Sequence, residues 1–561
     1  MKRNLAALLL LALLAACTAQ KQDRKADIPA DAPDVLAPYR EHKALLFDGM
    51  GSHGREITTR NAQAQKYFNQ GLALCYGFNH DEAIRSYAEA AKLDPDCAMA
   101  YWGMAYAMGP NFNLPMDEDH AKLAYASIQQ AIKRKENASA TERELIDAMA
   151  TRYSNPPAAD HAPLAKAYSQ AMGKLWQKYP KDQDIGFIYA ESLLNRHPWD
   201  QWTRDGKPKE DTLKVMEVLE AVLKLNINHV GANHMYIHTL EGSQNPEKAV
   251  AAAERLGALA PGIGHIVHMP AHIYMRMGRY RDSALCNAKA SQCDRDYFAK
   301  VGDQGIYHIY HVHNDHFLVW TAMFEGRYED AVKAADDMIT HMPEFFQAFP
   351  DVASFLVTKL EVYVRFGKWQ EILKYPQPRA DQPYAIAMWH YARGIALANT
   401  QKIEDARAEA AKFEEFAAKV PASHLINGVV PASEVLNIAR QMLAGETAFK
   451  AGETDKAFVS LRAAVEAESA MRYTEPNPWM VPTRHALGAL LLQQGKHKEA
   501  EDCYLADLRW YPENGWSLHG LAECQEARGA KQEAHMTHMR FEKAWKLATV
   551  EIHGSCFCRT Q

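Results

Sequence analysis

Histidine is concentrated in one part of the chain. The sequence has 25 histidines among 561 residues, and ten of them fall within residues 229–316, under a sixth of the length. His234 and His238 are four residues apart, as are His268 and His272, and the second pair follows the first by 34 residues. Two histidines with this spacing lie one above the other on a helix, about 5–6 Å apart at Cβ, as in two-histidine metal sites. The spacing therefore predicts a repeated metal-binding unit.

Further candidate ligands follow in the sequence. His313 and His316 belong to the histidine-dense segment 307–316, while Glu241 and Glu361 add carboxylates at neighbouring helical positions. Imidazole together with carboxylate suits copper, iron, nickel or zinc. We therefore expect a transition metal (copper, iron or zinc), with candidate ligands His234, His238, His268, His272, His313, His316, Glu241 and Glu361. The histidines at 308, 311, 313 and 316 could converge only if a turn fell near Asn314.

A second candidate site lies at the end of the chain, where Cys556 and Cys558 are separated by one residue. Two thiolates so close can hold Cu(I) or Zn²⁺. Alternatively, the two cysteines pair with each other or with other cysteines. Two further disulfide candidates, Cys75–Cys97 and Cys503–Cys524, lie about one helical hairpin apart.

Other interpretations of the histidines stay open. The central cluster could be a neutral polar network that makes a groove rigid, or it could bind an organic or peptide ligand directly. The sequence contains no CxxCH motif for c-type haem, so a bis-histidine b-type haem is the weaker cofactor alternative. Because Pro270 must lie in a first turn or kink its helix, His265 could fall in the preceding loop. The isolated His485 and His519 are expected to form hydrogen bonds rather than bind metal.

Motifs of the common enzyme classes are missing from the sequence. There is no HExxH, P-loop, GxSxG or dinucleotide-binding glycine pattern. Hydrolase and nucleotide-dependent activities therefore have no motif support, and no catalytic residue is assigned.

The elements that must position the histidines are helical repeats. Gly71 is followed by Ala83 and Pro95, and similar turns recur at Gly278, Gly326, Gly452, Gly495 and Gly529. This pattern resembles the tetratricopeptide repeat (TPR), which has two antiparallel helices in 34 residues. The resemblance implies an all-α solenoid, a right-handed superhelix with a concave groove lined by the first helix of each repeat.

The repeat register places the histidines on that groove. With the turn glycine as position 15, positions 2, 5, 9 and 12 form one stripe on the first helix. Seven histidines of three consecutive repeats fall on the stripe: His234, His238, His265, His268, His272, His313 and His316. The pattern around them resembles a bacterial family of exported TPR proteins, which implies a fold and no mechanism.

The N-terminus has the order of an export signal. Met1-Lys2-Arg3 is followed by a short apolar segment and by Leu14-Ala15-Ala16-Cys17, which resembles a bacterial lipoprotein signal. The resemblance implies that Cys17 is lipidated and that the protein is anchored in the cell envelope. The absence of Asp at residue 18 implies the outer membrane, facing the periplasm or the surface. Removal of residues 1–16 changes the formal charge from −6 to −8.

These observations predict the organisation of the whole chain. The predicted segments are the signal (1–16), a flexible stalk (17–45), N-terminal TPR-like helices (46–230), histidine-rich repeats (231–345), C-terminal repeats (346–548) and a Cys-x-Cys tail (549–561). The negative charge argues against a nucleic-acid partner, which requires a basic face. We expect a lipid-anchored protein that binds a transition metal in a histidine-lined groove. The alternative is an interaction scaffold for an envelope complex, binding a protein or peptide and no metal.

Overall fold

The computed structural model describes residues 34–41, 43–203, 205–302, 307–340 and 350–559. The predicted signal, Cys17 and the first part of the predicted stalk lie outside these residues. Among the residues described, we find no helix that combines the length and the apolar character needed to cross a membrane.

The N-terminal half is a series of helices connected by short turns. Its helices are α2 (Ala62–Tyr76), α3 (His80–Leu93), α4 (Ala98–Ala107), α5 (Glu118–Lys133), α6 (Ala140–Ala150), α7 (Ala162–Lys178), α8 (Gln183–Leu194), α9 (Thr212–Leu225), α10 (Val230–Leu240), α11 (Val250–Leu259), α12 (Gly264–His268), α13 (Pro270–Arg276) and α14 (Tyr280–Val301).

The second half continues in the same way. Its helices are α15 (His308–Phe324), α16 (Tyr328–Thr340), α18 (Thr358–Arg365), α19 (Trp369–Lys374), α20 (Pro383–Asn399), α21 (Ile403–Ala417), α22 (Ala432–Lys450), α23 (Thr454–Ala470), α24 (Thr483–Gln493), α25 (His497–Trp510), α26 (Gly515–Ala527) and α27 (Lys531–Ala544).

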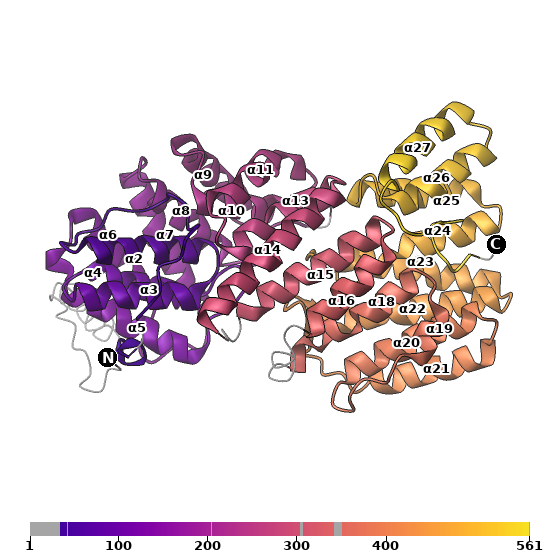
Figure 1. Ribbon diagram of the computed structural model, residues 1–561, viewed down its shortest axis with the longest axis horizontal. Coiled ribbons are helices and arrows are strands. Elements are labelled where there is room, and N and C mark those ends of the chain that lie inside the picture. Colours follow the sequence, from indigo (N-terminus) through magenta and orange to yellow (C-terminus); the bar gives the residue numbers. More distant parts are fainter. Residues whose placement is uncertain (1–33, 42, 204, 303–306, 341–349, 560–561) are drawn as a thin grey trace, which may run out of the picture.

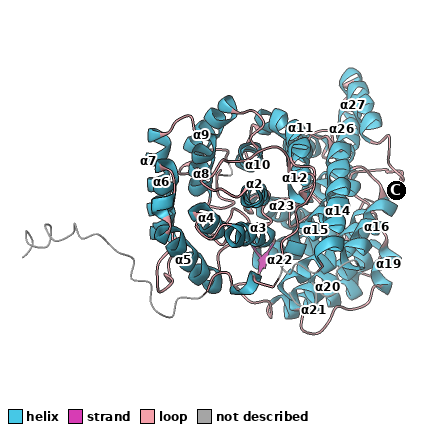
Figure 2. Ribbon diagram, turned by 60° about the vertical axis from the view of Figure 1, so that its left-hand side comes forward, coloured by secondary structure: helices cyan, strands magenta, loops and turns pink. Residues whose placement is uncertain are grey.

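Other regular structure is sparse in the described part of the chain (Figure 2). Two short antiparallel strands, β1 (Leu425–Ile426) and β2 (Val430–Pro431), precede α22. The 3₁₀ turns are η1 (Ala37–Tyr39), η2 (Lys135–Asn137), η3 (Pro246–Ala249) and η5 (Pro350–Val357).

Consecutive helices pack as hairpins, as in α2–α3, α13–α14, α15–α16 and α26–α27. The turn glycines Gly278, Gly326, Gly452, Gly495 and Gly529 all have positive φ, a conformation that favours glycine. Gly71 allows close packing within the first hairpin, because a Cβ there would lie 2.8 Å from the Tyr87 ring. These features confirm the predicted all-α, TPR-like solenoid.

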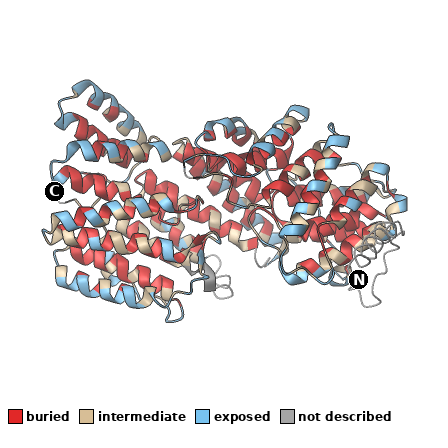
Figure 3. Ribbon diagram, turned by 180° about the vertical axis from the view of Figure 1, so that it is seen from behind, coloured by how far each residue is buried: buried red, intermediate tan, exposed pale blue. Residues whose placement is uncertain are grey.

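The molecule is elongated, with the N-terminal helices at one end and α19–α27 towards the other (Figure 1). Buried residues lie on the helix sides that face neighbouring helices, and exposed residues lie on the outer sides (Figure 3). The histidine-rich helices α10, α12, α13 and α15 lie between these ends, within the packed interior.

Candidate metal centre

Six imidazoles from three consecutive repeats come together in the interior. They are His234 and His238 of α10, His265 and His268 of α12, His272 of α13, and His313 of α15. Five of them are at most 3% exposed, and His313 is partly buried. The ligand nitrogens form two groups of three, within each of which all atoms lie within 4.8 Å of one another. We call His234, His238 and His265 triad 1, and His268, His272 and His313 triad 2.

His234 and His238 of α10 are each oriented by a hydrogen bond at Nδ1, which leaves Nε2 of each ring without a partner in the described part of the chain. Nδ1 of His234 lies 2.6 Å from the Tyr76 carbonyl oxygen, and Nδ1 of His238 lies 3.0 Å from Glu241 Oε1. Both partners are acceptors, so each Nδ1 carries the proton and each Nε2 presents a lone pair. Neither Nε2 has a hydrogen-bond partner among the described residues, and the same holds for both ring nitrogens of His265. Ligating histidines in metalloproteins are commonly oriented in this way by a carbonyl or carboxylate.

Triad 2 is arranged by the same principle. Nδ1 of His268 lies 2.6 Å from Oδ1 of Asn287 on α14, and Nδ1 of His272 lies 2.9 Å from Glu475 Oε2. The Nε2 atoms of His268 and His272 are then 2.9 Å apart. Ring centroids of His268 and His313 are separated by 4.7 Å.

Glu241 connects the two triads. Its Oε1 faces His238, and its Oε2 lies 3.1 Å from Nδ1 of His272. Burial raises the pKa of Glu241 to about 8, with a further contribution from Glu475. Burial alone would lower the pKa of His272, but the two carboxylates outweigh it and the pKa is raised. His272 is thus the imidazole of the two triads whose protonated form is favoured by its surroundings.

The other imidazoles of the two triads are neutral at pH 7. Burial lowers the pKa of His234, His238, His265, His268 and His313 well below the usual imidazole value, and repulsion between neighbouring imidazoles lowers it further. A neutral imidazole is the form that binds metal. Five of the six side chains are thus in the form that could bind a metal ion.

Aromatic side chains enclose the cluster. Phe78 lies against His234 and His265 with ring centroids 4.6 and 5.1 Å apart, and Phe317 lies 4.9 Å from both His268 and His272. Phe78 has a φ of 61°, which is unusual for a non-glycine residue. Such an apolar shell limits water around the imidazoles and strengthens electrostatic interactions inside it.

Pro270 interrupts the helix that carries His265, His268 and His272. It has no N–H for the Ile266 carbonyl, so α12 ends at His268 and α13 begins at Pro270. His265 lies within α12 and not in the preceding loop, so the expectation that it could leave the stripe is wrong. The kinked helix supplies one histidine to triad 1 and two to triad 2.

Two predicted ligands are absent from these groups of described side chains. Nε2 of His316 lies 3.1 Å from the sulfur of Met480, although His316 shares α15 with His313. Glu361 lies on α18, where burial raises its pKa to about 8, and burial together with the nearby Glu361 raises the pKa of Tyr384 on α20.

The segment 307–316 does not form a site of its own. No turn falls near Asn314, because α15 runs without interruption from His308 to Phe324. His308 packs on Phe298 at 4.2 Å between ring centroids, and His311 faces Asp294 and Asp315. Of the four histidines in this segment, only His313 belongs to a triad.

The isolated histidines differ from one another. The expectation for His485 is confirmed, since its Nε2 lies 2.8 Å from Asp507 Oδ2 on α25. His519 packs against Phe541 with ring centroids 5.3 Å apart.

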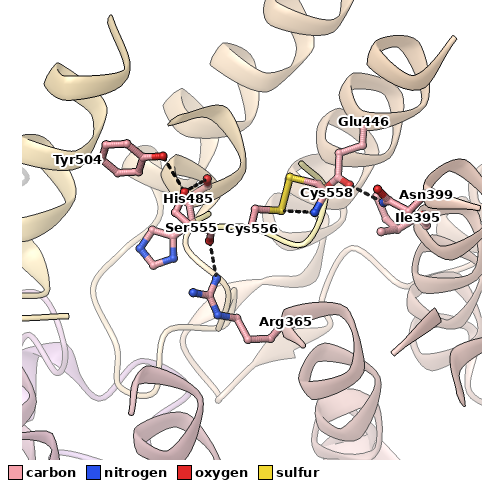
Figure 4. The surroundings of a disulfide bond; sticks show 9 residues. All are labelled: Arg365, Ile395, Asn399, Glu446, His485, Tyr504, Ser555, Cys556 and Cys558. Atoms are coloured by element: carbon pink, nitrogen blue, oxygen red, sulfur yellow. Dashed lines mark hydrogen bonds between the residues drawn. A yellow bond between two sulfur atoms is a disulfide. The ribbon is translucent and has the colours of Figure 1, made fainter. Parts of the chain in front are cut away.

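The sulfurs of Cys556 and Cys558 are joined as a disulfide beside Glu446, as Figure 4 shows. This is the alternative in which the two cysteines pair with each other, and in this oxidised form they offer no thiolate to a metal. Figure 4 also shows Ser555 next to this disulfide, where its hydroxyl donates to the His485 carbonyl. The tail is thus fixed against α24.

The other predicted disulfides are absent, since Cys75, Cys97, Cys503 and Cys524 are free thiols in the structure. Cys75 lies at the C-terminal end of α2, whereas Cys97 directly precedes α4. Because α2 and α4 are first helices of successive hairpins and run in the same direction, these two cysteines lie at opposite ends of the pair.

A third polar cluster was not predicted from the sequence. Oδ1 of Asp184 lies 2.9 Å from Nε2 of His53, 3.4 Å from Nε2 of His229 and 2.8 Å from the Tyr76 hydroxyl. Nδ1 of His229 accepts the Ala232 N–H, so its Nε2 carries the proton, although at 3.4 Å it forms no hydrogen bond with Asp184. The nearby imidazoles of His229 and His53 outweigh burial and hold the pKa of Asp184 well below its usual value. His53, Asp184 and His229 form a third group that could hold a metal ion, and the separation of its members in sequence concealed it.

A cavity of about 770 Å³ opens beside the cluster. His238, Glu241 and Glu475 lie in its wall, together with Arg276, Trp510 and Tyr473. The Arg276 guanidinium lies over the Trp510 ring, 4.6 Å from its centroid, and one of its amino groups donates to the Ser243 carbonyl at 3.2 Å. The cavity gives the cluster a route towards solvent.

No family model and no curated protein sequence matches the chain. Among solved structures, human IFIT1 bound to m7Gppp-AAAA is 13% identical with a TM-score of 0.37, and the alignment covers 87% of this chain and 91% of that one. Yeast Tom70 is 12% identical with a TM-score of 0.29, covering 84% and 90%. The TPR domain of P58(IPK) is 12% identical with a TM-score of 0.22, covering 84% and 100%. At these values the likenesses carry no argument about ligands, and the fold assignment stands on the helical hairpins.

Proposed function

We propose that this TPR-like scaffold binds a transition metal at its buried histidine cluster. The observation that carries the proposal is the set of unpartnered nitrogens in triad 1. A buried polar atom without a partner costs about 1–3 kcal/mol, and triad 1 places several such atoms together. A metal ion would satisfy the Nε2 atoms of His234 and His238 and one nitrogen of His265 at once.

The hydrogen bonds that hold His234 and His238 support a metal over a plain polar network. In a network of neutral imidazoles, each Nε2 lone pair would need an N–H donor. His234 and His238 each donate their Nδ1 proton, to the Tyr76 carbonyl and to Glu241 respectively, so neither ring has an N–H left to donate to the other. Imidazole ligands suit copper, zinc and iron.

Elemental analysis of the full chain, purified without a polyhistidine tag, tests the proposal. We expect at least one equivalent of copper, zinc or iron, which His234→Ala combined with His268→Ala removes. His316→Ala is the matched control, because His316 shares the groove stripe and lies outside both triads. Less than about 0.1 equivalent after reconstitution, unchanged by the double variant, would contradict metal binding. A b-type haem would instead give a Soret absorption band.

The second candidate function is an interaction scaffold that binds a protein or peptide. It is favoured by the cavity of about 770 Å³ between the central and C-terminal repeats. Crosslinking from this cavity, with a photoreactive residue in place of Trp510, should capture one defined polypeptide if this function is correct. Capture that is unchanged when the photoreactive residue replaces an exposed residue such as Leu213 would count against it.

We also propose that the protein is tethered to the bacterial envelope through Cys17, at the outer membrane. The support is the order of charge, apolar residues and Leu14-Ala15-Ala16-Cys17 in the sequence. Cys17→Ser should abolish incorporation of labelled palmitate and release the protein from the membrane fraction. Unchanged labelling would contradict the anchor.

A further inference from the structure

The six histidines are arranged as two equivalent sets, and we infer that the cluster holds two metal ions, one in each triad. This inference rests on the proposed metal binding and specifies its stoichiometry. Its basis is the division of the nitrogens into two groups, each with the number of imidazoles that a three-coordinate or open four-coordinate site requires.

Each triad is built by the same rule. An i, i+4 pair comes from one repeat, and the third histidine comes from position 2 of the next repeat. His234 and His238 pair with His265, and one repeat later His268 and His272 pair with His313. Ring centroids within the i, i+4 pairs are 4.9 Å and 4.7 Å apart, so the spacing is duplicated together with the sequence, whereas the angles between the ring planes are 44° and 86°.

The duplication ends after two copies. In the following repeat, position 5 is His316, but position 9 is Trp320 and position 2 of the next repeat is Ser354. A third triad is therefore impossible, and His316 contacts Met480 instead. Histidines that only filled the groove could be lost one position at a time. In this repeat, two of the three positions that would make a triad lack histidine together.

The orientation of the rings supports two separate ions. In each triad the Nδ1 atoms of the i, i+4 pair face acceptors outside the triad, which directs both Nε2 atoms inward. Triad 1 uses a carbonyl and a carboxylate, and triad 2 uses an amide oxygen and a carboxylate. Ring centroids of His265 and His268, which belong to different triads, are 5.7 Å apart, so the two sites are neighbours.

The charge of the surroundings favours monovalent ions. Glu241 and Glu475 are the carboxylates that contact the triads, and the buried Arg276 lies near Glu241. Two divalent ions would leave a large uncompensated positive charge in an apolar interior, which is costly. Two Cu(I) ions add two positive charges where two divalent ions add four, beside two carboxylates and the guanidinium of Arg276. Cu(I) is accordingly the probe for the test.

The experiment measures Cu(I) bound by the full chain under anaerobic conditions, in competition with a chromophoric Cu(I) chelator. The reference is a double variant, His265→Ala with His313→Ala, which keeps every cysteine and so accounts for copper bound to thiols. We expect the wild-type chain to hold two more Cu(I) ions than the reference, and each single variant to hold one more. His316→Ala should retain both.

Three outcomes would overturn the inference. They are a difference of one ion between wild type and reference, the loss of both ions in either single variant, and X-ray absorption spectra showing one six-coordinate environment. A wild-type chain that binds no metal contradicts the proposed function instead, so the two failures are distinguishable. If His265→Ala loses helical circular dichroism, His265→Gln replaces it, since His265 gives up no hydrogen bond on substitution.

Discussion

Nε2 of His268 lies 2.9 Å from Nε2 of His272 in the interior of the protein. Both rings direct Nδ1 towards an oxygen, Asn287 Oδ1 for the first and Glu475 Oε2 for the second. Two facing lone pairs at this distance repel each other unless a cation lies between or beside them. Of the two imidazoles His272 takes up a proton more readily, because Glu241 and Glu475 raise its pKa whereas burial lowers the pKa of His268. A metal ion would replace this proton.

Removal of the Asn287 amide should weaken triad 2 alone. Without Oδ1, the His268 ring is free to rotate, and loss of such an outer contact typically costs about 10–100-fold in metal affinity. Asn287→Leu should therefore lower the affinity for one of the two ions by this factor. Chelator competition measures the effect, and equal weakening of both ions would contradict the assignment of Asn287 to one triad.

Replacement of Glu241 should affect both metal ions, whereas replacement of Glu475 should affect one. Glu241 contacts a histidine of each triad, whereas Glu475 contacts only His272. Glu241→Gln should weaken both ions by about 10–100-fold, and Glu475→Gln should weaken one. The same competition assay applied to the two isosteric variants provides the comparison, and identical profiles would be inconsistent with the bridging position of Glu241.

Acid should destabilise the metal-free protein. Five histidines of the triads have pKa values well below 6.5, so the unfolded chain binds more protons than the folded chain as pH falls below about 6.5. The carboxyl of Glu241 acts in the opposite sense, because its folded pKa of about 8 exceeds its unfolded value and its protonated form is favoured at low pH. His272, with its raised pKa, contributes stability that is fully present below about pH 6.5 and is lost at higher pH.

Within the triads, five imidazoles outnumber one carboxyl between pH 6.5 and 5. Buried carboxyls elsewhere with raised pKa values, such as those of Glu191 and Glu361, act in the same sense as Glu241. The test is therefore a difference: on going from pH 6.5 to pH 5, the metal-free wild type should lose more free energy of unfolding in urea than the variant His234→Ala with His268→Ala. An equal or smaller loss in the wild type would show that the imidazoles are already charged in the folded state.

His265→Leu should stabilise the metal-free protein while removing one ion. Both ring nitrogens of His265 are buried and unpartnered, and an apolar side chain of similar volume removes that penalty, which is about 1–3 kcal/mol. The expected result is a higher urea midpoint than wild type, together with a smaller loss of stability on acidification. A lower midpoint would indicate that His265 has a hydrogen-bond partner in solution.

Two turn glycines allow a matched test of packing between repeats. Gly278 and Gly495 have φ values of 69° and 71°, so alanine costs about 1–2 kcal/mol of backbone strain at either position. A Cβ on Gly278 would also lie 2.3 Å from the Pro512 carbonyl oxygen, whereas one on Gly495 would meet nothing within 4 Å. Gly278→Ala should therefore lower the thermal midpoint clearly more than Gly495→Ala. Equal losses would mean that the turn does not pack on Pro512 in solution.

The repeat register accounts for what was predictable in the sequence. Hairpin turns and the stripe of histidines follow from local spacing, so the fold and the pairs at His234 and His268 could be predicted. His316 and Glu361 satisfy the same spacing but lie outside both triads, and His316 instead contacts Met480, 164 residues away in the sequence.

Contacts between segments that are distant in sequence could not be predicted from local spacing. Glu475 comes from a loop 203 residues after His272, and Tyr76 lies 158 residues before His234. Nothing in the local sequence of either residue marks it as an outer partner of a histidine. The kink at Pro270 also hid the role of His265, because helical periodicity does not continue through a proline.

Each triad takes its third histidine from the repeat that follows its pair. A bound ion would therefore crosslink two adjacent hairpins, and the two crosslinks together would span three repeats in the middle of the molecule. Pulling on the ends of the solenoid would then meet its greatest resistance there, and the force needed to separate these repeats would depend on the metal supplied. The number of bound metal ions would set the stiffness of the superhelix. The distance between the N-terminal helices and helices α19–α27 would then respond to the metal content of the surroundings.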